Sequence, residues 1–320
     1  MRRMSHASAP ALPPPDFEVA SAHPEAAWLR QAAAARDWAA IRNYVDGLPA
    51  GTDRSFAVRQ LGEVKGVEEW LRPLVEAQPH DVLALTVLGA REVNIGWEIR
   101  TSYAAEHVSR EQFAGLHAHL RQAEQLLIRA TALDPAFDAA WCERITTAMG
   151  LQLGQNEARR RYEQLAKHHP HHLTAQARLL QQLCPKWSGS WDAAHGFARE
   201  CAAVAPEGAP NAGLVAEAHF EHWYALKGAE RDAYLRQPHV RTELAQAADR
   251  SVFHPGFQRA YGWVSVTGCF AALFSLMGDL PRAAACFRLL GNLAGEYPWD
   301  YFGNAAQSYI RHRDAALARG

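Results

Sequence analysis

The chain has 320 residues, with 33 Lys and Arg against 34 Asp and Glu, a formal net charge of -1 and a hydrophobic content of 48%. This length and composition suffice for one large or two ordinary domains with a buried core. The balanced charge argues against nucleic acid as a partner, because that binding depends on excess positive charge. No apolar run approaches the roughly 18–20 residues that a membrane-spanning helix requires, so we expect no membrane insertion.

The first 20 residues are rich in Pro, Ala and Ser and include three consecutive prolines at 13–15. Such a composition cannot bury a core, so we predict a disordered or polyproline-like arm over 1–20 and a single helical-repeat domain over 21–320. The amino terminus lacks the apolar stretch of a secretory signal, and the five cysteines are scattered without a C-x-x-C pair. We therefore expect a cytoplasmic protein whose reduced thiols pack as small hydrophobic groups.

From Pro24 onward the sequence predicts helices, because Ala, Leu, Arg and Glu dominate and period-two alternation is nearly absent. Asp53 and Asp81 are predicted N-terminal caps, and Ser109-x-x-Gln112 is a capping-box pattern. The helices predicted from these caps and from Pro and Gly cover 24–36, 37–47, 53–62, 67–77, 81–100, 109–133, 137–150, 155–168, 172–183, 191–204, 210–226, 238–250, 256–277, 280–294 and 300–318. Their short connections predict antiparallel hairpins.

A repeated pattern of small and large apolar residues runs through the middle of the chain. Its copies are Ala123, Leu127, Ala130 and Pro135; Ala158, Tyr162, Leu165 and Pro170; Ala193, Phe197 and Pro206; and, near the end, Ala283, Phe287 and Leu290. The three prolines lie 35 and 36 residues apart, close to the roughly 34 residues of a tetratricopeptide repeat. The pattern predicts an all-α fold, a tetratricopeptide-like right-handed α-solenoid of antiparallel helical hairpins.

Several stretches resemble, in the same order, a group of bacterial tetratricopeptide-like proteins classed only as domains of unknown function. These stretches are GWEIRTS (96–102), VSREQF (108–113), AEQLLIRATALDP (123–135), LCPKWSGSWDAAHGFAR (183–199), AHFEHW (218–223), GDLPRAAACFRLLG (278–291) and PWDYF (298–302). Similar proteins often carry Gly where this chain has Thr101 and Ser188. The resemblance implies a bacterial helical-repeat protein and transfers no catalytic residue.

The segment VAEAHFEHWYAL places His219 and His222 three residues apart, on one face of a predicted helix. Together with Glu221 they could hold zinc or iron if another helix supplied a further ligand. The Glu-x-x-His signature of di-iron bundles is absent after Glu217, and H-E-x-x-H is absent as well. The other interpretation is a pair of histidines hydrogen-bonded between helices beside Trp223.

Trp97 and Arg100 form an aromatic and cationic pair at helical spacing, which can bind an anionic or aromatic partner. Alternatively, Trp97 lies in the core and Arg100 caps the helix. Trp187 and Trp191 flank the turn at Gly189 and could line a groove or join two hairpins. P-loop, nucleophile-elbow and dinucleotide-binding motifs are missing, so the sequence predicts no cofactor and identifies no catalytic residue.

A repeat array without a catalytic motif predicts a scaffold or adaptor that binds a protein or peptide on its concave helical surface. The candidate binding residues are Trp97, Arg100, Trp187, His219, His222 and Trp223. The alternative is a metal-dependent or small-molecule-processing enzyme with a site on the helix of His219 and His222, and a third possibility is small-ligand sensing. The sequence indicates neither the partner nor the oligomeric state.

Overall fold

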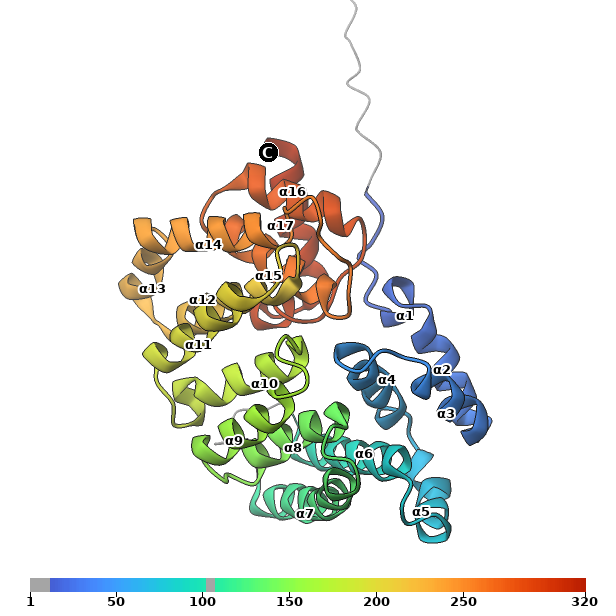
Figure 1. Ribbon diagram of the computed structural model, residues 1–320. Helices are drawn as coiled ribbons and strands as arrows, with labels where there is room; N and C mark the ends of the chain where they lie inside the picture. Colours follow the sequence, from blue (N-terminus) through green and yellow to red (C-terminus); the bar gives the residue numbers. More distant parts are fainter. Residues whose placement is uncertain (1–11, 102–106) are drawn as a thin grey trace, which may run out of the picture.

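The computed structural model describes residues 12–101 and 107–320, and this part of the chain is helical (Figure 1). Its helices are α1 (Val19–Ala22), α2 (Glu25–Ala34), α3 (Trp38–Asp46), α4 (Thr52–Gly62), α5 (Val67–Ala77), α6 (Val82–Arg100), α7 (Arg110–Leu133), α8 (Asp138–Gly150), α9 (Gln155–Ala166), α10 (Leu173–Leu183), α11 (Trp191–Val204), α12 (Gly213–Ala225), α13 (Gly228–Tyr234), α14 (Pro238–Arg250), α15 (Trp263–Leu276), α16 (Leu280–Leu290) and α17 (Ala305–Arg319). Short 3-10 turns cover Pro185–Trp187, Pro210–Ala212 and Trp299–Phe302. Within the described residues, β-pairing is confined to one isolated bridge between Asp16 and Leu293. The predicted all-α class is therefore confirmed.

Local sequence signals set most helix ends. The capping box at α7 is present, because Ser109 Oγ accepts from the backbone N–H of Gln112 at 3.2 Å and the Gln112 side chain accepts from the N–H of Ser109 at 2.9 Å. Asp81 caps α6 through a bond from the N–H of Ala84 at 3.0 Å. The cap predicted at Asp53 is wrong, since α4 is preceded by Gly51 and Asp53 lies in its first turn.

Several predicted helices are shorter in the structure than in the sequence analysis, and the largest shifts are at α15, α16 and α17. Helix α17 begins at Ala305 and not at 300, after the 3-10 turn Trp299–Phe302. Helix α15 begins at Trp263 and not at 256, after Gly262 adopts a left-handed conformation with φ 90°. Helix α16 ends at Leu290 and not at 294, because Gly291 has φ 65°. The short helices α1 and α13 were not predicted, because four and seven residues are too few to show a helical period.

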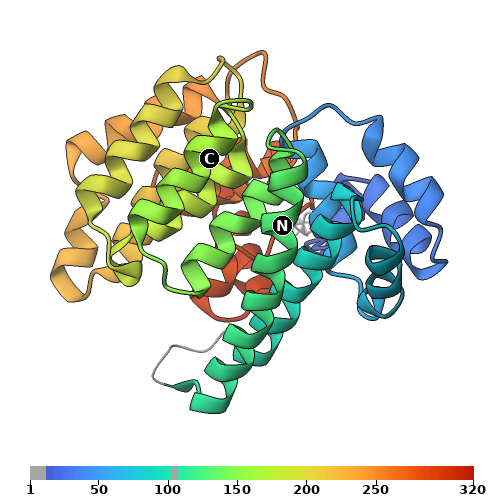
Figure 2. The same ribbon diagram turned by 60° about the horizontal axis from the view of Figure 1, so that its bottom comes forward.

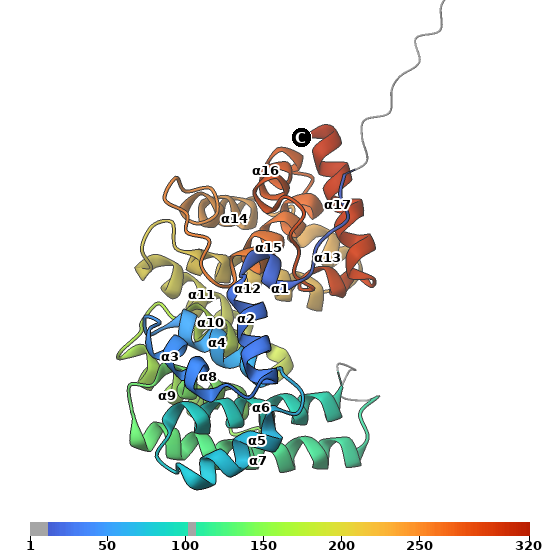
Figure 3. The same cartoon turned by 90° about the vertical axis from the view of Figure 1, so that its right-hand side faces the viewer.

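The helices pack in two sets of contacts (Figures 1 and 2). Successive helices pack side by side, as in the pairs α6 and α7, α8 and α9, and α15 and α16. A second set joins alternate helices, from α2 to α4, α6, α8, α10 and α12 in turn, and α12 also contacts α15. We call this series the even-numbered row, and we count α15 in it because α15 packs against α12, the last even-numbered helix of the series. The long pair α6 and α7 projects beyond its neighbours in Figures 2 and 3.

Residues of the repeated pattern occupy helix contacts. Ala123, Leu127, Ala130, Ala158, Leu165, Phe197, Ala283, Phe287 and Leu290 are buried. The rings of Tyr162 and Phe197, which hold equivalent places in successive copies, meet edge to face with centroids 5.3 Å apart. Alanine permits close approach of two helices, and the aromatic ring fills the space between neighbouring pairs.

The two ends of the described chain meet (Figure 3). The backbone of Asp16 donates to Asn292 O at 2.7 Å and accepts from Ala294 N at 2.8 Å, and Arg313 donates to the carbonyl of Pro13 at 2.6 Å. The arm predicted over 1–20 thus has two parts: residues 1–11 lie outside the described residues, whereas the following segment is held against the C-terminal helices. Backbone hydrogen bonding to partners almost 300 residues away left no local signal in the sequence.

An aromatic contact, which we call the closing contact, joins the same two regions. The ring of Tyr261 stacks on that of Phe56 in α4 with centroids 3.9 Å apart and an interplanar angle of 12°. The Tyr261 hydroxyl donates to Glu25 in α2, and His23 lies against the same ring at 4.6 Å. The arc of helices is therefore closed by contacts between its first and last parts.

The five cysteines are all unpaired and buried, which confirms that they pack as small hydrophobic groups. Burial raises the pKa of the Cys142 thiol to about 12, so this group stays protonated near neutral pH. Every helix in the described part of the chain is too short or too polar to cross a bilayer.

Candidate functional site

Trp97, Arg100 and Trp187 lie together on one groove, which we call the tryptophan groove. The indole rings of Trp97 and Trp187 meet edge to face with centroids 6.5 Å apart, and the Arg100 guanidinium lies 5.7 Å from the Trp97 ring. The groove has a volume of about 1220 Å³ and is lined further by residues of α7, α8 and the α8–α9 turn, including Phe113, Met149 and Leu153. The Trp97 and Arg100 pair and the tryptophan beside the Gly189 turn, which lie far apart in the sequence, thus form one surface.

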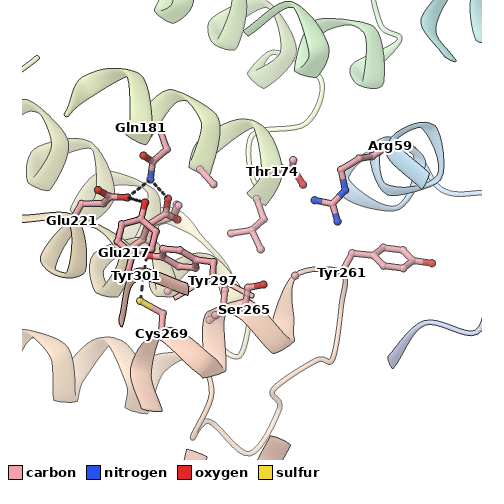
Figure 4. Close-up of a pocket in the computed structure, with 16 residues that line it drawn as sticks. Arg59, Thr174, Gln181, Glu217, Glu221, Tyr261, Ser265, Cys269, Tyr297 and Tyr301 are labelled. Carbon is pink, nitrogen blue, oxygen red and sulfur yellow. Dashed lines mark hydrogen bonds between the residues drawn. The ribbon is translucent and has the colours of Figure 1, made fainter. Parts of the chain in front are cut away.

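A second hollow, which we call the carboxylate cavity, lies between α10, α12 and α15 (Figure 4). Its volume is about 360 Å³. Glu217, Glu221, Gln181, Tyr297, Tyr301 and Cys269 surround one end, while Arg59 and Tyr261 lie across the space from them. Tyr261 therefore belongs both to the closing contact and to the wall of this cavity.

The two carboxylates share one amide donor. Gln181 Nε2 donates to Glu217 Oε1 at 2.6 Å and to Glu221 Oε1 at 3.1 Å. Glu221 also accepts from the Tyr301 hydroxyl at 3.2 Å and pairs with the Lys186 ammonium at 2.9 Å. Both oxygens of Glu221 thus accept hydrogen bonds, whereas among the described residues Glu217 accepts only from the shared amide.

The surroundings of Glu217 also change its pKa. Burial, opposed by the Gln181 hydrogen bond and reinforced by the charge of Glu221, raises the pKa of Glu217 to about 7. Desolvation disfavours the ionised carboxylate, and a like charge nearby does the same. A buried carboxyl that titrates near neutral pH on a cavity wall is typical of a binding or catalytic site.

A smaller hollow of about 250 Å³ joins the two larger ones. It shares Arg59 and Gln181 with the carboxylate cavity, and Trp97 and Met149 with the tryptophan groove. Its walls come from α4, α6, α8 and α10. The three hollows therefore follow the even-numbered row, and we call this continuous surface the inner face.

His219 and His222 meet His195 and Tyr234 in a cluster outside the inner face. His222 Nδ1 lies 3.0 Å from His195 Nε2 and 3.0 Å from the Tyr234 hydroxyl, and His219 Nδ1 lies 2.7 Å from that hydroxyl. The Trp191 ring stacks on His222 with centroids 4.4 Å apart. We call these four polar residues the histidine cluster.

The histidine cluster forms a hydrogen-bonded network that joins α11, α12 and α13. His219 Nε2 donates to Glu243 at 3.1 Å, and His219 Nδ1 shares a hydrogen bond with the Tyr234 hydroxyl. His222 Nδ1 lies within hydrogen-bond distance of both His195 Nε2 and the same hydroxyl. Burial and the neighbouring histidines lower the pKa of His195 to about 3, and burial with the nearby His219 lowers the pKa of His222 to about 4. The arrangement matches histidines hydrogen-bonded between helices.

The ligand set His219, His222 and Glu221 does not converge. Glu221 points into the carboxylate cavity and pairs with Lys186, while both histidines face the histidine cluster. Residues two apart on a helix are separated by about 200° around its axis, which explains the divergence. Among the described residues, no group of three or more His, Cys, Asp or Glu side chains is placed to hold a metal ion.

Trp223, also a predicted binding residue, lies apart from these sites. Its ring packs against Phe220 and Phe302 with centroids 5.7 and 5.9 Å away, and Arg231 covers it at 5.3 Å. The structure thus places Trp97, Arg100 and Trp187 on one groove and Trp223 in an aromatic contact. His219 and His222 lie in a hydrogen-bonded network that also lines a hollow of about 460 Å³.

The sequence analysis missed the residues that make the carboxylate cavity, namely Gln181, Glu217, Tyr297 and Tyr301. One signal was available, because Glu217 and Glu221 lie four residues apart and form an unfavourable like-charge pair on one helix face. Their partners come from α10 and the segment before α17, and nothing in the local sequence indicates that these segments meet.

Removing the Tyr234 hydroxyl is expected to destabilise the protein. The Tyr234→Phe variant leaves His219 Nδ1 and part of the His222 hydrogen bonding unsatisfied, and the expected loss is about 1–3 kcal/mol of unfolding free energy. Urea denaturation followed by circular dichroism measures it. Tyr224→Phe, at a ring that is 41% exposed on α12, is the matched control and is expected to change little; equal stability of the two variants would contradict the network.

Comparison with protein-family models finds no match for this chain, and comparison with curated proteins finds none either. Its function is therefore inferred from the inner face and the histidine cluster. Of these, the inner face is the larger and is continuous over several helices.

Proposed function

We propose that the chain is a tetratricopeptide-type solenoid that binds a peptide segment of a protein partner along its inner face. The carrying observation is the alignment of three adjoining hollows on the even-numbered row, with Trp97, Arg100 and Trp187 on the largest. Solenoids of stacked hairpins offer such concave surfaces for extended partners. The unpaired, buried cysteines fit a cytoplasmic location.

The size of the surface favours a peptide over a small ligand in the tryptophan groove. Pockets for small molecules usually measure about 300–1,000 Å³, and the groove alone has a volume of about 1220 Å³. Tryptophan and arginine are also the side chains most often found at energetic centres of protein interfaces. An extended chain with an anionic or aromatic side chain at Trp97 and Arg100 fits this lining.

The backbone offers support for the proposed family. Thr101 and Ser188, where the similar proteins often carry Gly, both have φ 68°. Left-handed backbone is the conformation that glycine adopts without steric cost. A common turn geometry at these two positions is therefore compatible with the resemblance.

The enzyme alternative has weaker support. Its metal-dependent form requires His219, His222 and Glu221 to converge, and the helix directs them to different sides. The imidazoles of the histidine cluster instead hydrogen-bond to one another, to Tyr234 and to Glu243. We therefore retain peptide binding as the proposed function.

Selection from a random dodecapeptide library displayed on phage tests this proposal. Peptides selected on the wild-type protein are expected to bind the double variant Trp97→Ala, Trp187→Ala at least about 30-fold more weakly, because loss of a central interface residue costs about 2 kcal/mol. Trp28→Ala, at an indole that is 39% exposed on α2, is the control and should bind normally. Equal affinity for the double variant would contradict binding in the groove.

A further inference from the structure

One atom of the carboxylate cavity has no partner. Glu217 Oε1 accepts from Gln181, but Oε2 accepts no hydrogen bond from the described residues and lies on the cavity wall. The Glu217 side chain is partly accessible, and it faces the cavity. Oε2 is therefore an open acceptor for a donor that enters the cavity.

The charge at this end of the cavity calls for a cation. Glu217 and Glu221 are like charges on successive turns of α12, and the Lys186 ammonium forms its ion pair, at 2.9 Å, with Glu221. When Glu217 is ionised, its charge has no direct ion pair among the described residues. Tyr297 and Tyr301, whose rings meet edge to face at 5.7 Å, wall the same end, and aromatic rings beside carboxylates favour cationic ligands.

We propose that the carboxylate cavity binds a primary alkylammonium group, presented by a lysine side chain of the peptide held on the inner face. The proposal rests on the peptide-binding function and names the side chain that this part of the inner face recognises. The ammonium would donate to Glu217 Oε2. The four methylene groups of lysine would lie against the apolar wall formed by Leu173, Leu214 and Val266.

The geometry favours an ammonium over a guanidinium. A guanidinium binds a carboxylate best as a fork, with two parallel hydrogen bonds to both oxygens. One oxygen of Glu217 is already taken by Gln181, and both oxygens of Glu221 are occupied. An ammonium is a compact charge with three donors and needs only the single free oxygen.

The opposite end of the cavity orients the ligand. Arg59 lies across the space from the two carboxylates (Figure 4). Its positive charge opposes an ammonium at that end and favours one beside Glu217. The volume of about 360 Å³ falls at the lower limit of small-ligand pockets, as suits one side chain.

Titration calorimetry at pH 8 tests the proposal with defined probes. The full chain is titrated with Nα-acetyl-lysine methylamide, with n-pentylamine, and with the neutral Nα-acetyl-norleucine methylamide. At this pH Glu217, with a pKa of about 7, is mostly ionised. We expect both amines to bind at least tenfold more tightly than the norleucine derivative, and Nα-acetyl-arginine methylamide to bind more weakly than the lysine derivative.

The Glu217→Gln variant is expected to lose at least tenfold in affinity for both amines. This variant also removes a carboxylate that is costly to bury when ionised, so its resistance to urea at pH 8 should equal or exceed that of the wild type, which separates lost binding from unfolding. Glu296→Gln, at an exposed residue beside Tyr297, changes the net charge equally and is the control.

Equal affinity for the neutral analogue, or unchanged amine affinity in Glu217→Gln, would overturn the ammonium site. If the arginine derivative bound more strongly than the lysine derivative, the ligand of the cavity would be a guanidinium and the ammonium proposal would be wrong. Binding of n-pentylamine without binding of the lysine derivative would overturn the peptide source and assign the cavity to a free amine. These titrations use no selected peptide, so their failure leaves the phage-display result at Trp97 and Trp187 intact, and failure of that selection leaves the amine result intact.

Discussion

Lowering the pH from 7 to 4.5 is expected to destabilise the protein, and two buried histidines together contribute about 5 kcal/mol to the loss of unfolding free energy. His172 and His195 are 2% and 8% exposed, and burial lowers the pKa of each to about 3. An unfolded histidine has a pKa of about 6.5, so below that pH the unfolded chain binds protons that the folded protein does not. The contribution of these two histidines to the unfolding free energy is therefore fully present above pH 6.5 and is lost as the pH falls toward 3.

Each of these two histidines removes about 1.4 kcal/mol per pH unit below 6.5, or about 5 kcal/mol together at pH 4.5. His222 and His312, whose pKa values are lowered to about 4 by burial, act in the same direction but are only partly buried. Glu217 acts in the opposite direction. Its raised pKa adds stability as the pH falls from 7, although less than its full shift suggests, because the carboxyl faces a cavity.

Such a loss is comparable to the whole stability of many domains, about 5–15 kcal/mol. Urea denaturation followed by circular dichroism between pH 8 and pH 4.5 measures it. A flat profile over this range would contradict burial of neutral histidines.

The variant His172→Asn isolates one contribution. His172 caps α10 by accepting from the N–H of Ala175 at 3.1 Å, and asparagine is an equally good cap without a titratable proton. The variant loses the 2.9 Å contact with Ser55, which lowers its stability at every pH. Below pH 6.5, however, its unfolding free energy should fall less steeply than that of the wild type, by about 1.4 kcal/mol per pH unit. The exposed His168→Asn is the matched control and should keep the wild-type slope; an unchanged slope in His172→Asn would contradict the assignment.

The second large effect is expected at the closing contact. Tyr261→Ala removes the ring that stacks on Phe56 at 3.9 Å and the hydroxyl that donates to Glu25. Loss of a buried aromatic ring costs about 3–5 kcal/mol, and because Tyr261 is partly exposed we expect about 2–3 kcal/mol. We also expect the N-terminal helices α1 to α3 to become more accessible to protease, since they lose one of their contacts with the C-terminal region while the hydrogen bonds of Pro13 and Asp16 remain.

Two readouts test this contact. Urea denaturation gives the loss of stability, and limited trypsin digestion with mass spectrometry locates the newly cleaved sites. Tyr261→Phe keeps the stacked ring and removes only the hydroxyl, so it should lose about 1 kcal/mol or less. Cleavage of Tyr261→Ala at the wild-type rate in the N-terminal region would show that the two ends are held without this ring.

The helices and several of their ends were predictable because the signals are local. Ser109 and Gln112 form the predicted capping box, and α5 and α11 have the predicted limits. Prediction from local signals placed the start of α15 and the end of α16 wrongly, next to Gly262 and Gly291. A glycine limits a helix through its left-handed conformation only when the surrounding packing selects that conformation. The glycines allow a left-handed backbone at these positions, and the packing of the folded protein determines that they adopt it.

The candidate site was only partly predictable. Helical spacing identified Trp97 with Arg100 and His219 with His222, because neighbours on one helix face are fixed by the period of the helix. The same period separates His219 from Glu221 and places Glu221 with Glu217, so the divergence of the alternative metal set has a reason that is present in the sequence. No spacing indicated that Gln181 would donate to both carboxylates.

By itself, the sequence determined that the chain is helical, where most helices begin and end, and which alanines and aromatic residues lie between them. Those properties depend on caps, breakers and a period of 3.6 residues, all of which act over a few positions. Only the tertiary structure decided that Trp97 meets Trp187, that Glu217 faces a cavity and that Tyr261 reaches Phe56. These contacts join residues far apart in the chain, and their geometry follows from the packing of whole helices against one another.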